Sequence, residues 1–286
     1  MPLQVAVLRV VLTFLKSRSP MKSFVAFFRA VVIVNLLIAA SGQNVAHGQA
    51  VSASSVDQSL VPIAQVNLHQ VLVSASNDPV AMTIAIFRAK NSHLDKPMLT
   101  EMFELQASNP DNATLAAGFC LAMDVANGQY HGPTFPAVSA EPKQSAAYAS
   151  ALQRAYRLEP GLWLTYLVQG HQFANSPDLD TRGLTLLKRA VQLAPNVSYT
   201  HYYLGWAYDL SGAVFSSSEK AKEEYTAAIT KLPMIAPPAF GLFSHAVVNP
   251  IDLIAARKAK AEFLKRIPKE YKLNAQVKAL IASVPD

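Results

Sequence analysis

The sequence predicts an all-α protein, in which antiparallel helix pairs stack into an α-solenoid that ends in capping helices. Apolar residues recur at helical spacing through most of residues 60–286, and no useful length of sequence alternates apolar and polar residues as a half-buried strand does. Several helical segments end in a proline after a similar run of residues. One segment, "YYLGWAY" at 202–208, places a glycine among bulky aromatic residues, where it costs a helix about 1 kcal/mol relative to alanine. A repeated helical unit with a close crossing at this glycine accounts for all three observations.

The N-terminal 50 residues predict an export signal. From Met21, a short basic part with Lys22 and Arg29 precedes the apolar run "AVVIVNLLIAA" at 30–40. The polar stretch after it ends in Gly-Gln-Ala, whose small residues occupy the two positions that a signal peptidase reads. We therefore expect residues 1–50 to be a signal peptide that starts at Met21 and is cleaved after Ala50.

Cleavage would place the protein in the periplasm or outside the cell. The alternative is an anchor in the inner membrane by an uncleaved signal, which would also use the apolar residues 5–15. The 11 residues at 30–40 are few for a membrane span, which favours cleavage. The sequence leaves open whether residues 1–20 are translated.

The formal net charge of +6 comes mostly from the same N-terminal stretch, which holds five basic residues and no acidic one. Residues 51–286 contain 20 basic and 19 acidic residues, so they lack the positive surplus with which proteins neutralise a phosphate backbone. We therefore expect no nucleic-acid partner. The single cysteine, Cys120, excludes an internal disulfide, so packing must hold the exported domain together.

Residues 51–59, "VSASSVDQS", predict a flexible linker, because clusters of serine between periodic segments are typical of loops. A helical repeat domain is expected from 60 to 286. Asp78 followed by Pro79 matches a helix N-cap with proline at the first helical position. The helix that begins there opens a first, degenerate unit at 79–110.

Four helical segments that end in proline define a repeat. They are "FELQASNP" at 110, "AYRLEP" at 160, "AVQLAP" at 195 and "AITKLP" at 233, and their separations are 50, 35 and 38 residues. Self-similarity at a period of this size indicates a repeat architecture. The longest separation contains an insertion.

The repeat resembles the tetratricopeptide repeat (TPR), in which a first helix carries a large residue, Leu-Gly and Tyr, and a second helix carries Ala, an aromatic residue, Ala and a final Pro. The clearest units are 161–195 and 196–233. The later unit supplies Leu204, Gly205, Tyr208, Ala221, Tyr225, Ala228 and Pro233, with His201 where tryptophan is typical. The earlier unit supplies Tyr166, Gly170, Phe173, Leu187, Ala190 and Pro195, with Gln169 in place of leucine and Gly183 in place of the first alanine. A weaker unit supplies Phe119, Cys120, Met123, Leu152, Ala155 and Pro160.

This resemblance implies a role for the small residues. The first helix of each unit must present a residue with almost no side chain where the second helix crosses it, and Gly170 and Gly205 would lie there. Ala190 and Ala228 would do the same on the second helix. Cys120 falls at the same position in the weaker unit, so we expect a small buried apolar side chain rather than a reactive thiol.

The insertion "ANGQYHGPTFPAVSAEPK" at 126–143 separates the two helices of the weaker unit. Its three prolines and two glycines exclude a helix. A loop of this length is either a tolerated surface insertion or a functional loop.

Two amphipathic stretches, from Pro250 to about Arg266 and from Lys272 to Val284, predict the polar-faced capping helices that a solenoid needs. Basic residues outnumber acidic ones there, which fits either a solvated outer face or contact with acidic lipid headgroups or another anionic partner. Membrane-surface contact would use Lys258, Lys265 and Arg266.

No pattern of residues predicts a catalytic, metal or cofactor site. The sequence contains no HExxH, no Gly-x-Ser-x-Gly and no phosphate-binding loop. His93 and Asp95 could ligate a metal only with ligands from distant segments. We therefore expect no catalytic residue, no metal and no cofactor.

The concave face of the solenoid is the predicted partner site. In the family's register it is lined by eight residues of the two clearest first helices, which we call the inner stripe: Leu164, Leu167, His171, Asn175, Tyr199, Tyr202, Trp206 and Asp209. Exposed Tyr and Trp side chains are common binding anchors, so the inner stripe would bind an extended or helical apolar peptide segment. The alternative is that the stripe is core, buried by a neighbouring helix.

These observations predict a non-catalytic interaction or scaffold module of the bacterial cell envelope, which holds another envelope or secreted protein in its groove. The alternative is an envelope enzyme or small-ligand-binding protein with a pocket under the loop at 126–143. Tyr130 and His131 would then be the candidate functional side chains of that pocket.

Overall fold

The computed structural model describes residues 56–127, 141–175, 181–210, 216–231, 241–243, 246–247, 253–267 and 275–285. The predicted export signal and residues 128–140 of the insertion lie outside these ranges. Within them the chain forms helices and no strand, which confirms the all-α prediction. In chain order the elements are η2 (Gln58–Leu60), η3 (Gln65–Asn67), α3 (Leu68–Ser74), α4 (Pro79–Asn91), α5 (Asp95–Ser108), α6 (Ala113–Ala126), α7 (Pro142–Leu158), α8 (Trp163–Ala174), α9 (Thr181–Leu193), α10 (Ser198–Asp209), α11 (Ser218–Thr230), α13 (Leu253–Arg266) and α14 (Ala275–Ser283).

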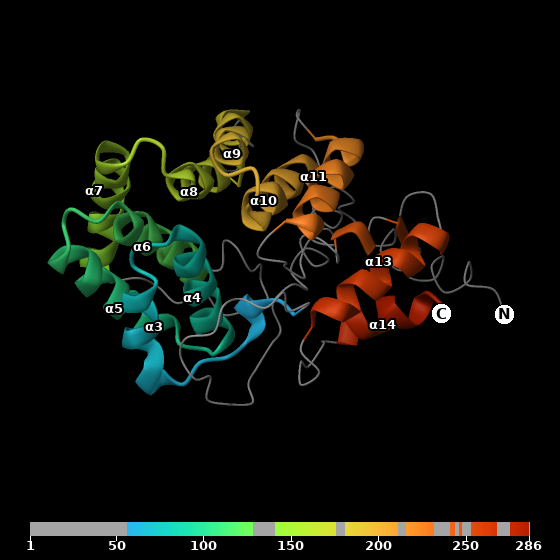
Figure 1. Cartoon of the computed structure of the whole chain (residues 1–286), viewed down its shortest axis with the longest axis horizontal. Coiled ribbons are helices and arrows are strands. Elements are labelled where there is room, and N and C mark those ends of the chain that lie inside the picture. The colour runs from blue at the N-terminus through green and yellow to red at the C-terminus, as the bar shows by residue number, and fades with distance from the viewer. Residues whose placement is uncertain are drawn as a thin grey trace, which may run out of the picture.

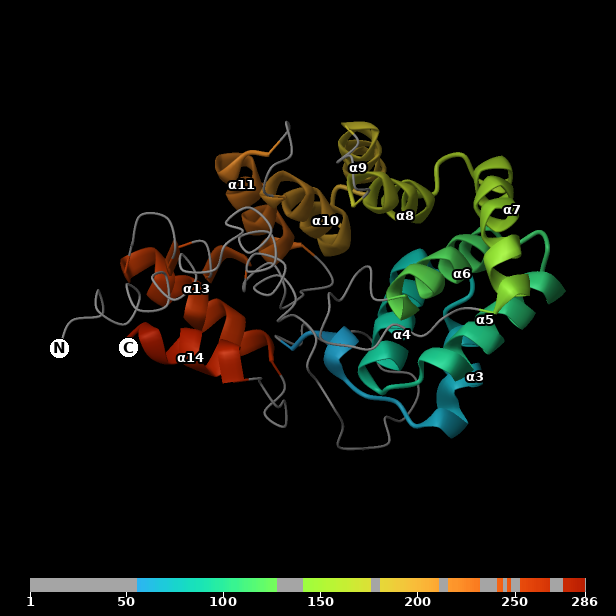
Figure 2. The same cartoon turned by 180° about the vertical axis from the view of Figure 1, so that it is seen from behind.

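Helices α4 to α11 form four successive pairs: α4–α5, α6–α7, α8–α9 and α10–α11. The first helix of each pair also contacts the first helix of the next, so that α4 packs on α6, α6 on α8, and α8 on α10. Figure 1 shows these pairs following one another in an arc, from the blue-green helices to the orange ones, and Figure 2 shows the same order from behind. This is the side-by-side stacking expected of an α-solenoid.

The starts of several helices follow from local side-chain chemistry. The carboxylate of Asp78 accepts hydrogen bonds from the backbone N–H groups of Val80 (2.8 Å) and Ala81 (3.1 Å), which confirms the predicted N-cap of α4. Asn112 caps α6 through the N–H of Leu115 at 2.9 Å. Each cap satisfies donors that the first turn of a helix leaves unpaired.

The two helices of a pair differ in how much of their surface is buried. Every residue of α6 is buried, and so is every residue of α10 from Ser198 to Tyr208. The second helices α9 and α11 bury only three residues each, which form a narrow stripe. The first helices therefore form the inside of the array, and the second helices cover its outside.

The array curves until its first and last pairs meet. Phe87 of α4 stacks on Tyr199 of α10, with ring centroids 5.8 Å apart and ring planes 2° from parallel. One apolar core accordingly runs without interruption from Leu68 to Ala228.

The C-terminal helices α13 and α14 form a second, smaller apolar cluster with Phe243, and they pack at the end of the array as the predicted capping helices do. The guanidinium of Arg266 in α13 donates a hydrogen bond to the carbonyl of Ile229 in α11 at 3.1 Å. No helix within the described ranges is both long and apolar enough to cross a membrane.

The predicted flexible linker at 51–59 is wrong at its C-terminal end. Residues 57–63, which we call the strap, run between α4 and the C-terminal helices, as the blue segment in Figures 1 and 2 shows. Asp57, Ser59 and Leu60 of the strap are buried. Leu60 belongs to the C-terminal cluster, so composition alone hid a buried anchor among polar residues.

Candidate functional site

The α8–α9 crossing is built from two glycines. A Cβ atom added to Gly183 would lie 2.3 Å from the backbone nitrogen of Ala174, and one added to Gly170 would lie 2.9 Å from the side chain of Leu187. The first contact joins the C-terminal end of α8 to the N-terminal end of α9. The second joins a residue further back in α8 to a residue further along α9, so the two helices run antiparallel. The prediction that Gly170 lies at a crossing is confirmed, and Gly183 proves to be the tighter of the two positions.

The α10–α11 crossing explains the glycine in "YYLGWAY". A Cβ atom added to Gly205 would lie 2.8 Å from the ring of Tyr225 in α11. A Cβ atom added to Gly241, in the segment after α11, would lie 2.8 Å from the other edge of the same ring. The ring of Tyr225 therefore fills the space between two glycines, and its hydroxyl donates to a carboxylate oxygen of Asp209 at 3.3 Å.

Cys120 occupies the equivalent position in α6 and is fully buried. Its thiol donates a long hydrogen bond, 3.5 Å, to the backbone carbonyl of Tyr148 in α7. Burial, with a smaller contribution from the nearby carboxyl group of Asp124, raises the pKa of Cys120 well above its ordinary value. A thiol that resists ionisation at a helix crossing fits the predicted role of a small apolar side chain.

The inner stripe is core, not an open groove. Leu164, Leu167 and His171 of α8 are buried, and so are Tyr199, Tyr202 and Trp206 of α10, whereas Asn175 and Asp209 are partly exposed. His171 and Trp206 lie where α8 packs on α10, Tyr199 lies where α10 meets α4, and the ring of Tyr202 packs near that of Tyr225 in α11. The prediction that this stripe offers an exposed aromatic surface is therefore wrong, and the alternative of a buried stripe is correct.

His171 shows how the stripe joins neighbouring units. Its ring lies 4.5 Å from that of Trp206, at 33°, and meets the ring of Tyr203 edge-on at 5.5 Å. Burial lowers the pKa of His171 to about 3, so the ring is neutral at physiological pH. It serves as an aromatic spacer between α8 and α10.

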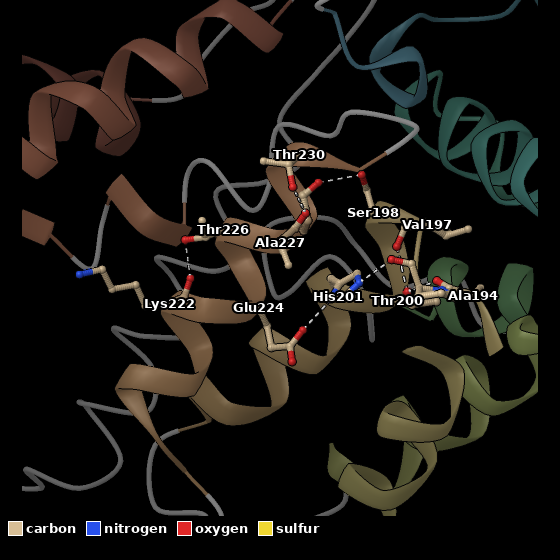
Figure 3. Close-up of polar contacts among 12 residues, drawn as sticks. Ala194, Val197, Ser198, Thr200, His201, Lys222, Glu224, Thr226, Ala227 and Thr230 are labelled. Atoms are coloured by element: carbon tan, nitrogen blue, oxygen red, sulfur yellow. Dashed lines mark hydrogen bonds and ion pairs between the residues drawn. The ribbon is translucent and has the colours of Figure 1, made fainter. Parts of the chain in front are cut away.

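His201, which replaces the family's tryptophan, links α10 to α11 by polar contacts instead (Figure 3). Its Nδ1 lies 2.7 Å from the carboxylate of Glu224, and its Nε2 lies 2.9 Å from the carbonyl of Pro195. Both neighbours are acceptors, so the doubly protonated ring suits them best. Burial alone would lower the pKa of His201, but these hydrogen bonds outweigh it and the pKa is raised.

We expect Glu224→Gln to destabilise the protein more at pH 6 than at pH 8.5. A raised pKa in the folded protein means that the contribution of His201 is complete below the unfolded value of 6.5 and is lost as the pH rises through the folded value. The expected cost at pH 6 is about 1–2 kcal/mol, the worth of a hydrogen bond to a charged group. Urea unfolding at both pH values measures it, with the exposed neighbour Glu223→Gln as control. An equal cost at both pH values would contradict the ionic role.

A polar cluster lies at the point where the loop 126–143 leaves α6. The hydroxyl of Tyr148 in α7 donates to the carboxyl group of Asp124 at 3.0 Å, and the amide of Gln172 in α8 donates to its other oxygen at 3.4 Å. Burial raises the pKa of Asp124 well above its usual range, although the two hydrogen bonds act in the opposite direction. One carboxyl group thus bridges the three helices α6, α7 and α8.

The weak metal pattern at His93 and Asp95 has a structural explanation. Asp95, at the start of α5, forms an ion pair of 2.6 Å with the buried Lys90 of α4. His93 lies in the turn between the two helices with a left-handed φ of 58°. No group of three potential metal ligands occurs in the described part of the chain.

The structure corrects the predicted membrane-contact set at one position. Lys258 and Lys265 are exposed on α13, but the side chain of Arg266 is buried. Its guanidinium pairs with Glu262 and reaches the carbonyl of Ile229. Arg266 therefore joins two helices and is not available to a headgroup.

Sequence reasoning missed a set of side chains at the C-terminal end of α4, which we call the α4 clamp: Arg88, Asn91 and Ser92. The amide of Asn91 donates to the carbonyl of Ser59 at 2.7 Å, and Nε of Arg88 donates to the carbonyl of Val61 at 2.8 Å. The hydroxyl of Ser92 accepts from the N–H of Ile63 at 2.7 Å. No sequence motif marks these residues, because their partners are backbone groups of a segment that reads as linker.

Comparison with known proteins gives little beyond the fold. No family model and no curated protein matches the chain. Among solved structures, the chain is similar to a thermophilic TPR protein of Thermus thermophilus, with 17% identity and a TM-score of 0.42, over 70% of this chain and 89% of that one. The nested helix pairs themselves establish an all-α array that resembles tetratricopeptide repeats.

Proposed function

We propose that the protein is an exported, non-catalytic interaction module of the bacterial cell envelope, which binds a segment of another envelope or secreted protein. The observation that carries this proposal is the array of nested helix pairs, with glycine at the α8–α9 and α10–α11 crossings. Stacked helix pairs generally work through extended surfaces that contact other proteins. Because the inner stripe is buried, we expect the partner to contact other surfaces of the array and not the stripe itself.

Photo-crosslinking in the native envelope tests this proposal. A photoreactive amino acid replaces, one at a time, Val66 beside the strap, Leu158 at the end of α7 and Ile254 on α13, which are exposed apolar positions on different parts of the fold. We expect a discrete adduct from at least one position, and excess unlabelled protein should suppress it. The proposed function is rejected if excess unlabelled protein suppresses no adduct at any of the three positions.

The export half of the proposal has its own test. The signal pattern predicts a mature protein that begins at Val51, because the small residues before it suit signal peptidase. N-terminal sequencing of the protein from fractionated cells should give Val-Ser-Ala-Ser-Ser in the periplasmic or secreted fraction. An N-terminus at Met1 or Met21 in the membrane fraction would instead indicate the uncleaved anchor.

A second candidate function is an envelope enzyme or small-ligand-binding protein with its pocket under the loop at 126–143. The convergence of Asp124, Tyr148 and Gln172 close to the C-terminal end of α6, from which that loop departs, favours it, since a buried carboxyl group with a raised pKa is a common feature of functional sites. Tyr130 and His131 lie outside the described residues. Asp124→Asn keeps the shape of the group, so full complementation of a deletion strain by this variant would remove the candidate.

A further inference from the structure

Part of the hold on the strap is through its main chain. The α4 clamp contacts backbone groups at Ser59, Val61 and Ile63, which are alternate residues of the segment. Arg88 also approaches the carbonyl of Pro62 at 3.5 Å. Residues 58–60 of the strap form the 3-10 helix η2, so the clamp recognises main-chain groups of a segment that turns once and then extends.

Leu60 is the apolar anchor of the strap, beside the buried Asp57 and Ser59. Leu60 is buried in the apolar cluster that includes Phe243 and Phe263 of the C-terminal part. The N–H of Asp57 donates to the backbone carbonyl of Arg266 at 3.0 Å and holds the segment in the same place. A charged or small residue at the position of Leu60 would leave this cluster unfilled or bury a charge.

The clamp has unused capacity for hydrogen bonding. The Asn91 side chain is 1% exposed, and its Oδ1 has no hydrogen-bond partner in the described structure. A buried acceptor without a partner destabilises the fold, and an additional backbone N–H would satisfy it. The strap, partly wound into the 3-10 helix η2, does not supply that N–H.

The strap is joined to the rest of the fold by an exposed connection. Residues 64–67 are all exposed, with Val66 at 88%. The first buried residue after them is Leu68, at the start of α3. The strap can therefore leave the clamp without unwinding a buried helix.

From these contacts we propose that the α4 clamp is a binding site for a peptide segment that adopts the conformation of the strap and carries one large aliphatic residue. The strap fills this site in cis, and a partner segment of the same kind replaces it. The existence of that partner rests on the proposed function, whereas the peptide site does not. A tethered strap acts at an effective concentration in the millimolar range, so a free peptide competes poorly with it until the tether is cut.

The test uses the full chain with a protease recognition sequence inserted at 64–67, folded first and cut afterwards. The probe is a fluorescein-labelled copy of residues 57–63, Asp-Gln-Ser-Leu-Val-Pro-Ile, and a second probe carries Leu60→Asp. Fluorescence anisotropy should show saturable binding of the first probe to the cut protein. We expect at least tenfold weaker binding to the uncut protein, and at least tenfold weaker binding of the Leu60→Asp probe.

Variants of the clamp extend the test. Asn91→Ala should weaken probe binding at least tenfold, and Glu104→Ala, at an exposed position on α5, should leave it unchanged. The comparison of the two probes uses the unaltered clamp, so it stands even if Asn91→Ala does not fold. The proposal is overturned if the cut protein binds neither probe, binds both alike, or unfolds when the strap is lost, because the strap is then an integral part of the fold.

The outcomes also separate this site from the proposed function. If the cut protein binds the probe but excess unlabelled protein suppresses no photo-adduct, the peptide site is supported and the interaction module is rejected. If excess unlabelled protein suppresses a photo-adduct but excess strap peptide does not, the interaction module is supported and its partner binds outside the α4 clamp.

Discussion

Gly183→Ala should destabilise the protein by about 3 kcal/mol, which corresponds to a fall of about 10 °C in the melting temperature of a domain of this size. The added methyl group would lie 2.3 Å from a backbone nitrogen of α8. A backbone cannot turn aside as a flexible side chain can, so α8 and α9 must separate along their whole contact. The gain in helix propensity, about 1 kcal/mol, offsets only part of this cost.

Gly161→Ala is the matched control for that experiment. A Cβ atom at Gly161 meets nothing within 4 Å, so the same change of residue should alter stability by less than about 1 kcal/mol, in the stabilising direction. Chemical denaturation of the two variants beside the unaltered protein gives the comparison. Equal effects of the two substitutions would mean that α8 and α9 do not approach as closely as the crossing requires.

The protein should lose about 3 kcal/mol of stability between pH 7.5 and pH 4.5 through His171 alone. The pKa of this buried ring is lowered to about 3, from 6.5 for an unperturbed histidine. As the pH falls below 6.5 the unfolded chain takes up a proton at this residue and the folded chain does not. Stability from His171 is therefore complete above pH 6.5 and declines steadily toward pH 3.

His171→Phe isolates this contribution, because phenylalanine keeps a ring against Trp206 without a titratable group. The variant should be much less sensitive to acid than the unaltered protein, while His69→Gln, at an exposed histidine, should leave the acid sensitivity in place. Guanidinium unfolding curves at several pH values give the slopes. If the free energy of unfolding changes with pH in the same way for His171→Phe and the unaltered protein, the ring of His171 is not buried away from water as described.

Local sequence signals predicted the helix pairs well, because each pair is determined by residues close together in the chain. The cap at Asp78, the small residues Gly170 and Gly205, and the proline-ended segments are all local features, and the structure agrees with each. Gly183 was read as a departure from the repeat, since it replaces an alanine. Among the glycines that the structure describes, Gly183 leaves the least room for a Cβ atom, because both helices bring a glycine to the same crossing.

Long-range features could not be predicted in the same way. The exposure of the inner stripe depends on how sharply the array curves, and that curvature is the sum of small rotations between units. Contact between Phe87 and Tyr199, 112 residues apart, buries the stripe that periodicity alone left undecided. The strap was missed for a similar reason: its anchors are a single leucine and backbone groups, which leave no periodic pattern.

A double-mutant cycle between Phe87 and Tyr199 measures most directly whether the first and last helix pairs meet and so bury the inner stripe. The unfolding free energies of Phe87→Leu, Tyr199→Leu and the double variant are compared with that of the unaltered protein. If the rings stack as described, the two substitutions are non-additive, with a coupling of about 1 kcal/mol. Additivity within about 0.3 kcal/mol would show that the pairs do not touch, and that the array is open where we describe it as closed.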